Sequence, residues 1–295
     1  MARMWTADAE NGTRPLLIAT DLDGTLLPPG GHPSERTRRA LRATWEAGLE
    51  TVFVTGRPPR WVDHLAEDVG GHGVVICANG AFVYDVAERR LLAGHGMDPS
   101  VARDVARLVS SVLPGATFAA EMEDRFLVEP PYLAARPQRY TAHADVDAID
   151  AVDRPVAKLL VQVPGFGADG MSVGVIDPFE DTLAAFAGAV ARVRDAVGDA
   201  GEVVTSGMVG LIEIGPAGVT KASALEEFCG ERGVAAADVW AFGDQHNDVA
   251  MLRWAGRSFA AGDVPREVLE VVTDRCAGPE DDGVAQVLEW LVRGA

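Results

Sequence analysis

Two aspartates, Asp21 and Asp23, stand at the end of an unbroken apolar run and are accompanied by Gly24 and Thr25. The run, residues 16–19, predicts a buried strand from a parallel sheet that is covered on both faces. Gly24 allows the backbone to turn sharply and to approach a ligand closely. Two carboxylates, a flexible turn and a hydroxyl at a strand tip indicate a site for a metal ion and a phosphoryl group. Taken alone, the same residues also fit an ordinary strand-to-turn junction, where Asp and Gly are common for conformational reasons.

Polar residues follow two further apolar segments of the chain. They are Thr55, Gly56 and Arg57 after residues 51–54, and Asp244, Asn247 and Asp248 after residues 239–243. In open α/β sheets, ligands bind beyond the carboxyl ends of the strands. If the three strands are parallel neighbours, their polar residues converge there, which favours a functional site over an ordinary turn.

The chemistry that these residues suit is phosphoryl transfer. A carboxylate can attack phosphorus and form an aspartyl-phosphate, which splits one hard hydrolysis into two easier steps. Mg²⁺ prefers oxygen ligands and often bridges carboxylates and phosphate oxygens, and Asp21 and Asp244 can supply those carboxylates. The Thr55 hydroxyl and the Lys221 ammonium would then hold phosphoryl oxygens, where the charge of the transition state is spread. Lys221 stands at a predicted helix start, where the helix dipole disfavours a cation, and this favours a functional role.

The composition predicts a soluble globular protein with a strongly acidic surface. The chain has 295 residues, enough for two domains of ordinary size, and 48% of them are hydrophobic. Its formal net charge of −18 predicts a surface that repels nucleic acid and anionic membranes, and no basic cluster offsets it. An anionic substrate would therefore depend on a bound metal or on particular Lys and Arg residues.

The cysteines and the N-terminal segment indicate a reducing cytoplasm. Cys77, Cys229 and Cys276 are scattered and odd in number, so they form neither a disulfide framework nor a metal-ligand spacing. Residues 1–14 lack the apolar core of a signal peptide. No apolar segment reaches the length that is needed to span a bilayer.

The order of the expected elements predicts an α/β unit that is interrupted by an α+β insertion. Residues 1–85 and 215–295 read as the α/β unit with a doubly wound parallel sheet, and residues 86–214 as the insertion. We expect helices at 34–47, 100–113, 182–197 and 284–292, with further helices after Lys221 and near Asn247. We expect strands at 16–21, 51–55, 74–77, 117–129, 156–163, 239–243, 258–261 and 271–273, and two antiparallel strands within 203–214 that meet at Gly207.

Four groups of residues resemble the motifs of the haloacid dehalogenase superfamily and occur in that family's order. They are Asp21-Leu22-Asp23-Gly24-Thr25-Leu26-Leu27, Thr55-Gly56-Arg57, Lys221, and Gly243-Asp244-x-x-Asn247-Asp248. Asn79-Gly80-Ala81, Val219-Thr220-Lys221 and Asp282-Gly283-Val284-Ala285 resemble the Cof-type branch, which carries a type IIB (C2) cap between the second and third motifs. The resemblance covers nearly all of residues 15–292. It implies a Rossmann-like core with an inserted α+β cap at residues 86–214. The chain departs from the family pattern at Gln245-His246, where a small residue is common.

The resemblance also implies a role for each motif residue. Asp21 would be the nucleophile, and Asp23 the general acid and base. Phosphate would be bound by Thr55, Gly56, Lys221 and Asn247, and Mg²⁺ by Asp21, the Asp23 carbonyl, Asp244 and Asp248. Substrate contacts are candidate roles for Arg57, Asn79 and His246, although Arg57 also fits a solvated turn and His246 a solvent-facing loop. In the insertion, Arg125, Arg136, Arg139 and Lys158 fit either contacts to the leaving group or surface charges.

The function that we expect is a cytoplasmic, Mg²⁺-dependent phosphatase of small phosphorylated metabolites, working as a monomer or homodimer. Sugar phosphates are the leading substrate class, because Cof-type relatives often act on them. Dehalogenases and phosphonatases that resemble this pattern lack an acid at the position of Asp23, which favours phosphate esters. One alternative is a phosphomutase that resembles phosphomannomutase. A second, less favoured one is a non-catalytic phospho-aspartate signalling module, which would be smaller and uncapped.

Overall fold

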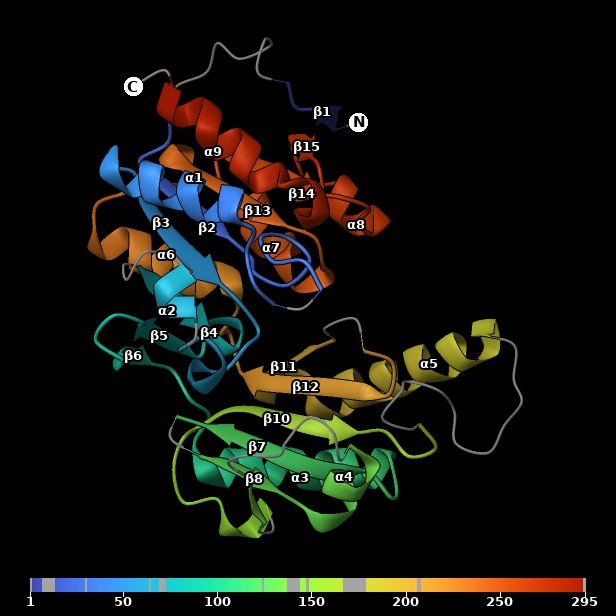
Figure 1. Cartoon of the computed structure of the whole chain (residues 1–295). Coiled ribbons are helices and arrows are strands. Elements are labelled where there is room, and N and C mark those ends of the chain that lie inside the picture. The colour runs from blue at the N-terminus through green and yellow to red at the C-terminus, as the bar shows by residue number, and fades with distance from the viewer. Residues whose placement is uncertain are drawn as a thin grey trace. The chain divides into compact units, whose positions relative to one another are not determined.

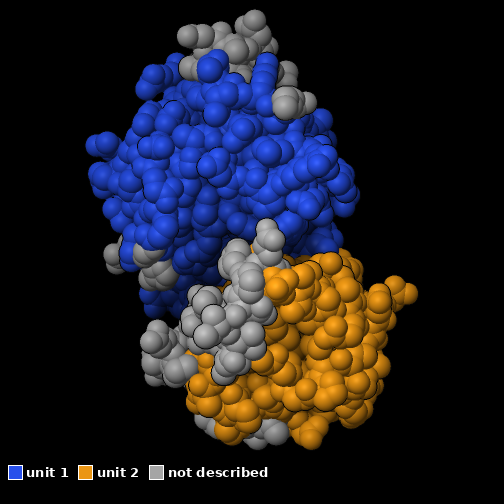
Figure 2. Space-filling model, turned by 90° about the vertical axis from the view of Figure 1, so that its right-hand side faces the viewer, with its two compact units in different colours: residues 1–94, 220–295 blue, residues 95–219 orange. Residues whose placement is uncertain are grey.

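The chain divides into two compact units, residues 1–94 with 220–295, and residues 95–219 (Figure 2). The computed structural model describes residues 2–6, 14–29, 31–63, 65–68, 73–123, 125–136, 144–146, 149–166, 179–205 and 208–293. The first unit runs to residue 94, beyond the residue 85 expected from the sequence, because a β-hairpin extends its sheet.

The first unit is built on a mixed sheet with, over the described residues, the strand order β1-β15-β14-β13-β2-β3-β4-β5-β6 (Figure 1). Its strands are β1 (Arg3–Met4), β2 (Leu17–Thr20), β3 (Glu50–Val54), β4 (Val74–Cys77), β5 (Phe82–Asp85), β6 (Arg90–Gly94), β13 (Val239–Gly243), β14 (Arg257–Ala261) and β15 (Asp274–Cys276). Strands β2, β3, β4, β13, β14 and β15 run parallel, as does β1 to β15, while β5 and β6 are antiparallel to their neighbours. This arrangement confirms the predicted α/β fold.

Helices cover both faces of this sheet, which explains its continuous apolar strands. The helices are α1 (Glu35–Glu46), α2 (Leu65–Asp68), α6 (Lys221–Glu231), α7 (Val249–Trp254), α8 (Arg266–Leu269) and α9 (Gly283–Arg293). Leu17 and Ala19 of β2 belong to one apolar core with Leu225 of α6 and Met251 of α7. Helices α1 and α9 pack against each other on the other face (Figure 1). All four residues of β2 are consequently buried.

The strand order puts the sheet's switch point beside β2. From β2 the chain proceeds through β3 and β4 in one direction, and β13, β14 and β15 lie in the other. The carboxyl ends of β2 and β13 are adjacent, with Thr20 paired to Phe242. A point where the strand order reverses is where open α/β sheets bind ligands, because the chain leaves neighbouring strand ends in opposite directions.

The second unit has its own sheet, with the order β11-β12-β10-β7-β8-β9 over the described residues. Its elements are β7 (Thr117–Met122), β8 (Phe126–Val128), β9 (Ala144–Val146), β10 (Val156–Gln162), β11 (Gly201–Val204), β12 (Leu211–Pro216), α3 (Pro99–Val112), α4 (Pro130–Ala135) and α5 (Phe179–Val197). Leu159 of β10 shares an apolar core with Val105 of α3 and Val193 of α5. Leu160, which points to the opposite face, joins a smaller cluster with Tyr132 of α4.

Most expected elements are present, and two of the differences have clear causes. The single strand expected at 117–129 is an antiparallel pair, β7 and β8, that is separated by a turn at Glu123. The strand expected at 271–273 begins instead at Asp274. Because Asp274 is charged although it is buried, this strand does not stand out in the sequence as an apolar run. Short strands β1, β5 and β6 were not predicted. Gly207 lies outside the described residues. None of the helices in the described part of the chain is long and apolar enough to cross a membrane.

Two positively charged side chains of the second unit are buried, although a surface position was one of the two interpretations that the sequence allowed. Lys158 on β10 donates a hydrogen bond of 2.9 Å to Glu213 on β12, and both side chains are less than 10% exposed. Arg136 is buried as well and donates to Gln162. Lys and Arg are rarely buried without such partners. Arg139 lies outside the described residues.

The Lys158–Glu213 pair gives the first testable prediction. Lys158→Ala should lower the free energy of unfolding by about 3 kcal/mol, because it leaves Glu213 as a buried charge without its ammonium partner. Urea unfolding followed by far-ultraviolet circular dichroism measures the change. The control is the double variant Lys158→Met/Glu213→Leu, which removes both charges of the pair and should recover part of the loss, because buried Glu121 still stands opposite position 158 on β7. A double variant as unstable as Lys158→Ala would contradict this account.

The second prediction concerns pH and Asp274. Burial alone would raise the pKa of Asp274, but hydrogen bonds from Arg257 (2.8 Å) and Arg3 (2.6 Å) outweigh it and hold the pKa below its ordinary value. A lowered pKa stabilises the fold above the pKa of the unfolded chain, and this contribution disappears as the pH falls. Asp274→Asn should therefore destabilise the protein at neutral pH and progressively less toward about pH 4 and below.

Urea unfolding followed by tryptophan fluorescence suits this test, because Arg257 also stacks on Trp240. The difference in unfolding free energy between wild type and Asp274→Asn is compared between neutral and acid pH. A difference that does not change with pH would show that the ionised carboxylate of Asp274 contributes no stability.

Candidate active site

The candidate site begins at Asp21, the residue that follows β2. Its backbone N–H continues the ladder by donating to the carbonyl of Phe242 on β13, at 3.0 Å. Thr20 fixes the next peptide through a hydrogen bond from its hydroxyl to the Asp21 carbonyl, at 2.8 Å. The Asp21 side chain is only 7% exposed. The strand end therefore holds a carboxylate in a protected position at the switch point of the sheet.

Lys221 is the cation of this cluster. Its Nζ donates to Oδ1 of Asp21 and to Oδ1 of Asp248, each at 2.6 Å, and the lysine is almost fully buried. Burial alone would lower the pKa of Lys221, but the charges of Asp21 and Asp248 outweigh it and raise the pKa above its ordinary value. Lys221 is therefore a permanent positive charge near neutral pH.

A capping box fixes the backbone that carries Lys221. Thr220 is the N-cap of α6: its hydroxyl accepts from the N–H of Ser223 at 3.1 Å, and the Ser223 hydroxyl accepts from the N–H of Thr220 at 2.8 Å. Reciprocal caps of this kind satisfy backbone donors that a helix start would otherwise leave open. The cap thus sets where α6 begins and where Lys221 stands.

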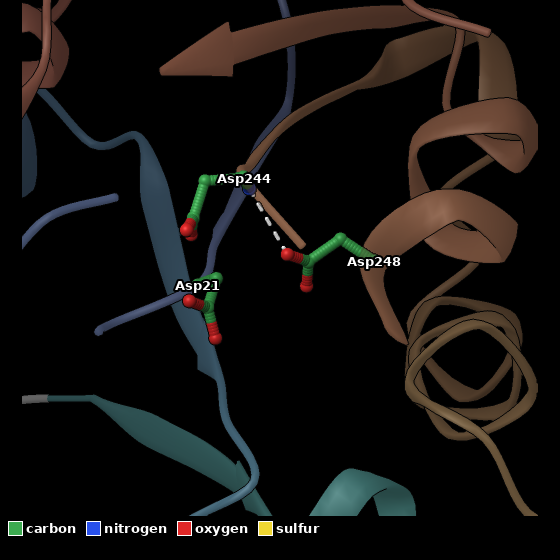
Figure 3. Close-up of side chains that lie close together, drawn as sticks. All are labelled: Asp21, Asp244 and Asp248. Carbon is green, nitrogen blue, oxygen red and sulfur yellow. Dashed lines mark hydrogen bonds between the residues drawn. The ribbon is translucent and has the colours of Figure 1, made fainter. Parts of the chain in front are cut away.

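Asp244 and Asp248 lie beside Asp21, beyond the end of β13 (Figure 3). Asp248 is held because its Oδ2 accepts from the backbone N–H groups of Asp244 (3.0 Å) and Gln245 (2.9 Å). Asp244 is held by side chains: Thr25 donates to its Oδ1 at 2.7 Å, and Gln245 to its Oδ2 at 3.0 Å. The three carboxylates are thereby fixed from separate segments.

Gly24 makes room for Asp244. Its φ is +88°, and a Cβ atom built there would lie 2.5 Å from Oδ2 of Asp244. Real Cβ atoms do not approach other atoms that closely, so only glycine fits at this position. The sharp turn predicted at Gly24 is therefore present, and the group that lies against it is a carboxylate of the cluster.

The carboxylates of Asp21, Asp244 and Asp248 fit a divalent cation. One oxygen from each lies within 4.8 Å of the others, and all three residues are buried. Burial raises the pKa of Asp21 and of Asp244. Lys221 only partly offsets this for Asp21, and hydrogen bonds from Thr25 and Gln245 only partly offset it for Asp244. Three carboxylates with one lysine leave two net negative charges when all are ionised. Such an all-oxygen, doubly negative donor set suits Mg²⁺, which prefers hard oxygen ligands.

Asp23 has a different environment from Asp21. Its side chain is 58% exposed, whereas that of Arg57 beside it is 14% exposed. Arg57 donates two hydrogen bonds to it, from Nε to Oδ2 at 2.7 Å and from Nη2 to Oδ1 at 2.5 Å. A bidentate pair of this kind fixes orientation as well as distance. The carboxylate of Asp23 is thus outside the buried cluster and is oriented by Arg57.

The remaining predicted residues lie on three loops. Thr55 is buried after β3, and its hydroxyl accepts from the N–H of Arg57 at 3.1 Å. Gly56 packs close to Asn79, whose Oδ1 accepts a hydrogen bond of 3.0 Å from Nδ2 of Asn247. His246 is exposed and is not part of the buried cluster.

Two residues of the site were not assigned a role from the sequence, namely Thr25 and Gln245. Both donate to Asp244. Thr25 stands within the first motif, so its spacing was a usable signal. Gln245 was visible only as a departure from the family pattern, and nothing in the sequence indicates that its amide folds back onto Asp244.

Comparison with known proteins places this site in a family. The model of the haloacid dehalogenase-like hydrolases matches residues 18–288. The 5-amino-6-(5-phospho-D-ribitylamino)uracil phosphatase YitU of Bacillus subtilis is 28% identical over 279 residues, which cover 94% of this chain and 97% of the relative. The HMP-PP phosphatase of Enterobacter sp. strain 638 is 27% identical over 263 residues, which cover 86% of this chain and 87% of the relative.

Solved structures agree on the fold. A haloacid dehalogenase-like hydrolase from Bacteroides thetaiotaomicron superposes with a TM-score of 0.72 at 22% identity, covering 92% of this chain and 98% of the other. A subclass IIB sugar phosphatase of the haloacid dehalogenase superfamily gives 0.73 at 18% identity, covering 94% and 98%. At these identities the likeness establishes the fold, and the family model establishes the membership. The chain is an enzyme and belongs to the haloacid dehalogenase-like hydrolases, the family of these phosphatases.

Proposed function

We propose that this chain is a Mg²⁺-dependent phosphatase that hydrolyses small phosphorylated metabolites through an aspartyl-phosphate on Asp21. The observation that carries the proposal is the buried Asp21 carboxylate at the switch point of the sheet, with Lys221 at 2.6 Å. Asp244 and Asp248 complete a cluster that fits a divalent cation. A buried carboxylate with a fixed cation and an adjacent metal site suits attack on phosphorus better than any structural role.

The first half of the reaction forms the covalent intermediate. Oδ1 of Asp21 is held by Lys221, and we assign Oδ2 as the atom that bonds to phosphorus. As that bond forms, the bond from phosphorus to the leaving oxygen breaks, and Asp23 supplies a proton to this oxygen. Lys221 and the Thr55 hydroxyl stabilise the phosphoryl oxygens, on which negative charge is spread in the transition state.

The second half regenerates the enzyme. Asp23, now ionised, takes a proton from water, which attacks phosphorus, and the bond to Asp21 breaks to release orthophosphate. Mg²⁺, held by Asp21, Asp244, Asp248 and the Asp23 carbonyl, would supply charge neutralisation and would orient the phosphoryl group. Asp23 suits proton transfer because it is exposed and oriented by Arg57, unlike buried Asp21.

Phosphorylated sugars or polyols are the substrate class that we favour. One relative is named for a phosphoribityl compound, and one structural neighbour is named a sugar phosphatase. We also place the enzyme in the cytoplasm, where such metabolites occur. Its three cysteines are buried free thiols, which fits a reducing compartment.

The third prediction tests the reaction itself. Wild-type protein with Mg²⁺ should release orthophosphate from members of a panel of sugar phosphates, nucleotides and p-nitrophenyl phosphate. Asp21→Asn should lower this rate by roughly 10⁴-fold or more, because the residue that forms the covalent bond is gone. EDTA should abolish release, and added Mg²⁺ should restore it.

Circular dichroism of Asp21→Asn serves as the control for folding. If the protein converts a hexose 1-phosphate to an isomeric sugar phosphate and releases no orthophosphate, it is a mutase and not a phosphatase. A folded Asp21→Asn variant that keeps wild-type turnover would rule out Asp21 as the nucleophile.

The fourth prediction separates two roles for Arg57. If Arg57 orients Asp23, Arg57→Lys should lower kcat about tenfold and leave KM nearly unchanged, because lysine cannot form the bidentate pair. If Arg57 binds the phosphoryl group, KM should rise instead. Steady-state kinetics with p-nitrophenyl phosphate distinguishes the two. Arg60→Lys, which alters a nearby arginine that stacks on Trp61, is the matched control and should leave both constants unchanged.

A further inference from the structure

A three-residue turn, Ala78–Gly80, follows β4 with an unusual backbone. All three residues have positive φ: 51° at Ala78, 58° at Asn79 and 112° at Gly80. Glycine adopts such angles freely and asparagine tolerates them, but alanine does so at a cost in free energy. Conformations of this kind persist only where surrounding contacts determine them, and they are concentrated at functional sites.

The backbone of this turn contacts two loops of the proposed site. The N–H of Ala78 donates to the carbonyl of Arg57 at 2.9 Å, and the N–H of Asn79 donates to the carbonyl of Thr55 at 3.0 Å. Gly80 lies directly against Thr220, because a Cβ atom at Gly80 would be 2.4 Å from the Thr220 carbonyl oxygen. The turn thus joins the loop after β3 to the helix start that carries the catalytic lysine.

The side chain of Asn79 reaches a third loop. Its Oδ1 accepts a hydrogen bond of 3.0 Å from Nδ2 of Asn247, the residue before Asp248. The other end of the Asn247 amide, Oδ1, is buried and has no hydrogen-bond partner among the residues that the structure describes. A buried acceptor in this state is stabilised when a ligand or water donates a hydrogen bond to it.

We propose that Asn79 is a positioning residue that acts through Asn247. By holding Nδ2, Asn79 fixes the orientation of the Asn247 amide, so that its Oδ1 accepts a hydrogen bond from a hydroxyl group or water that enters the site. Asparagine suits position 79 because it combines tolerance of positive φ with a side-chain acceptor. The inference rests on the proposed function for its kinetic readout, although its test by phosphate binding does not.

The test uses two substitutions that separate backbone from side chain. Asn79→Gly keeps the positive φ and deletes the amide, so its urea midpoint should stay near that of wild type. Asn79→Ala deletes the amide and also strains the backbone, so its urea midpoint should fall. In both variants kcat/KM for p-nitrophenyl phosphate should fall about three- to tenfold, as expected for one lost hydrogen bond.

A double-mutant cycle with Asn247→Ala decides whether Asn79 acts through Asn247. In the native background, Asn79→Gly should lower kcat/KM and weaken orthophosphate binding, measured by calorimetry with Mg²⁺, by about threefold or more. In the Asn247→Ala background, the same change should alter either quantity less than about twofold. Equal losses in the two backgrounds, or no loss in either, would overturn the inference.

Ala78→Gly is the matched control, because it relieves the backbone at the neighbouring position and leaves the Asn79 amide in place. It should keep kcat/KM and orthophosphate affinity within about twofold of wild type. A wild-type protein that binds orthophosphate but hydrolyses nothing on the panel would overturn the proposed function. In that case the binding cycle would still decide the role of Asn79.

Discussion

The burial of Lys221 between Asp21 and Asp248 is the constraint on which the rest of the site depends. A buried ammonium is costly unless its donors are satisfied with good geometry, and here two carboxylates accept from it at 2.6 Å. The three residues come from the end of β2, the start of α6 and the loop after β13. Each of these segments must be correctly placed for the charges to balance. The fold of the first unit therefore brings the site together.

The topology of the sheet places residues of this site at adjacent strand ends. Pairing of Thr20 with Phe242 puts the ends of β2 and β13 in register, and the main-chain hydrogen bond from Asp21 to Phe242 continues this ladder, so Asp21 and Asp244 follow adjacent strand ends. Side chains then refine the geometry, as Thr25 and Gln245 do for Asp244. The remaining excess of negative charge is what a divalent cation would neutralise. The cluster is thus set by the fold, and its three carboxylates fit a divalent cation.

Sequence reasoning succeeded where a local pattern carries the information. The apolar run of β2, the helix expected at 34–47 and the strand ends at Asp21 and Asp244 are of this kind. It failed where the partner is distant in the chain. Nothing near Lys158 indicates that Glu213, 55 residues away, pairs with it inside the second unit. Strand order and side-chain pairing are properties of the folded chain, so patterns along one segment cannot supply them.

Asp21 and Asp23, the two acids of the first motif, have identical side chains in different environments, and these environments suit them to different chemistry. Asp21 is buried, its pKa is raised chiefly by that burial, and Lys221 holds one of its oxygens. Asp23, two residues later, is largely exposed and is oriented by Arg57. A protected carboxylate beside fixed cations suits covalent attack, whereas an accessible one suits repeated exchange of protons. Gly24, the residue after Asp23, brings the backbone against Asp244. One short segment therefore carries the proposed nucleophile, the proposed acid–base group and a glycine that lies against the proposed metal site, so substitutions there should affect all three together.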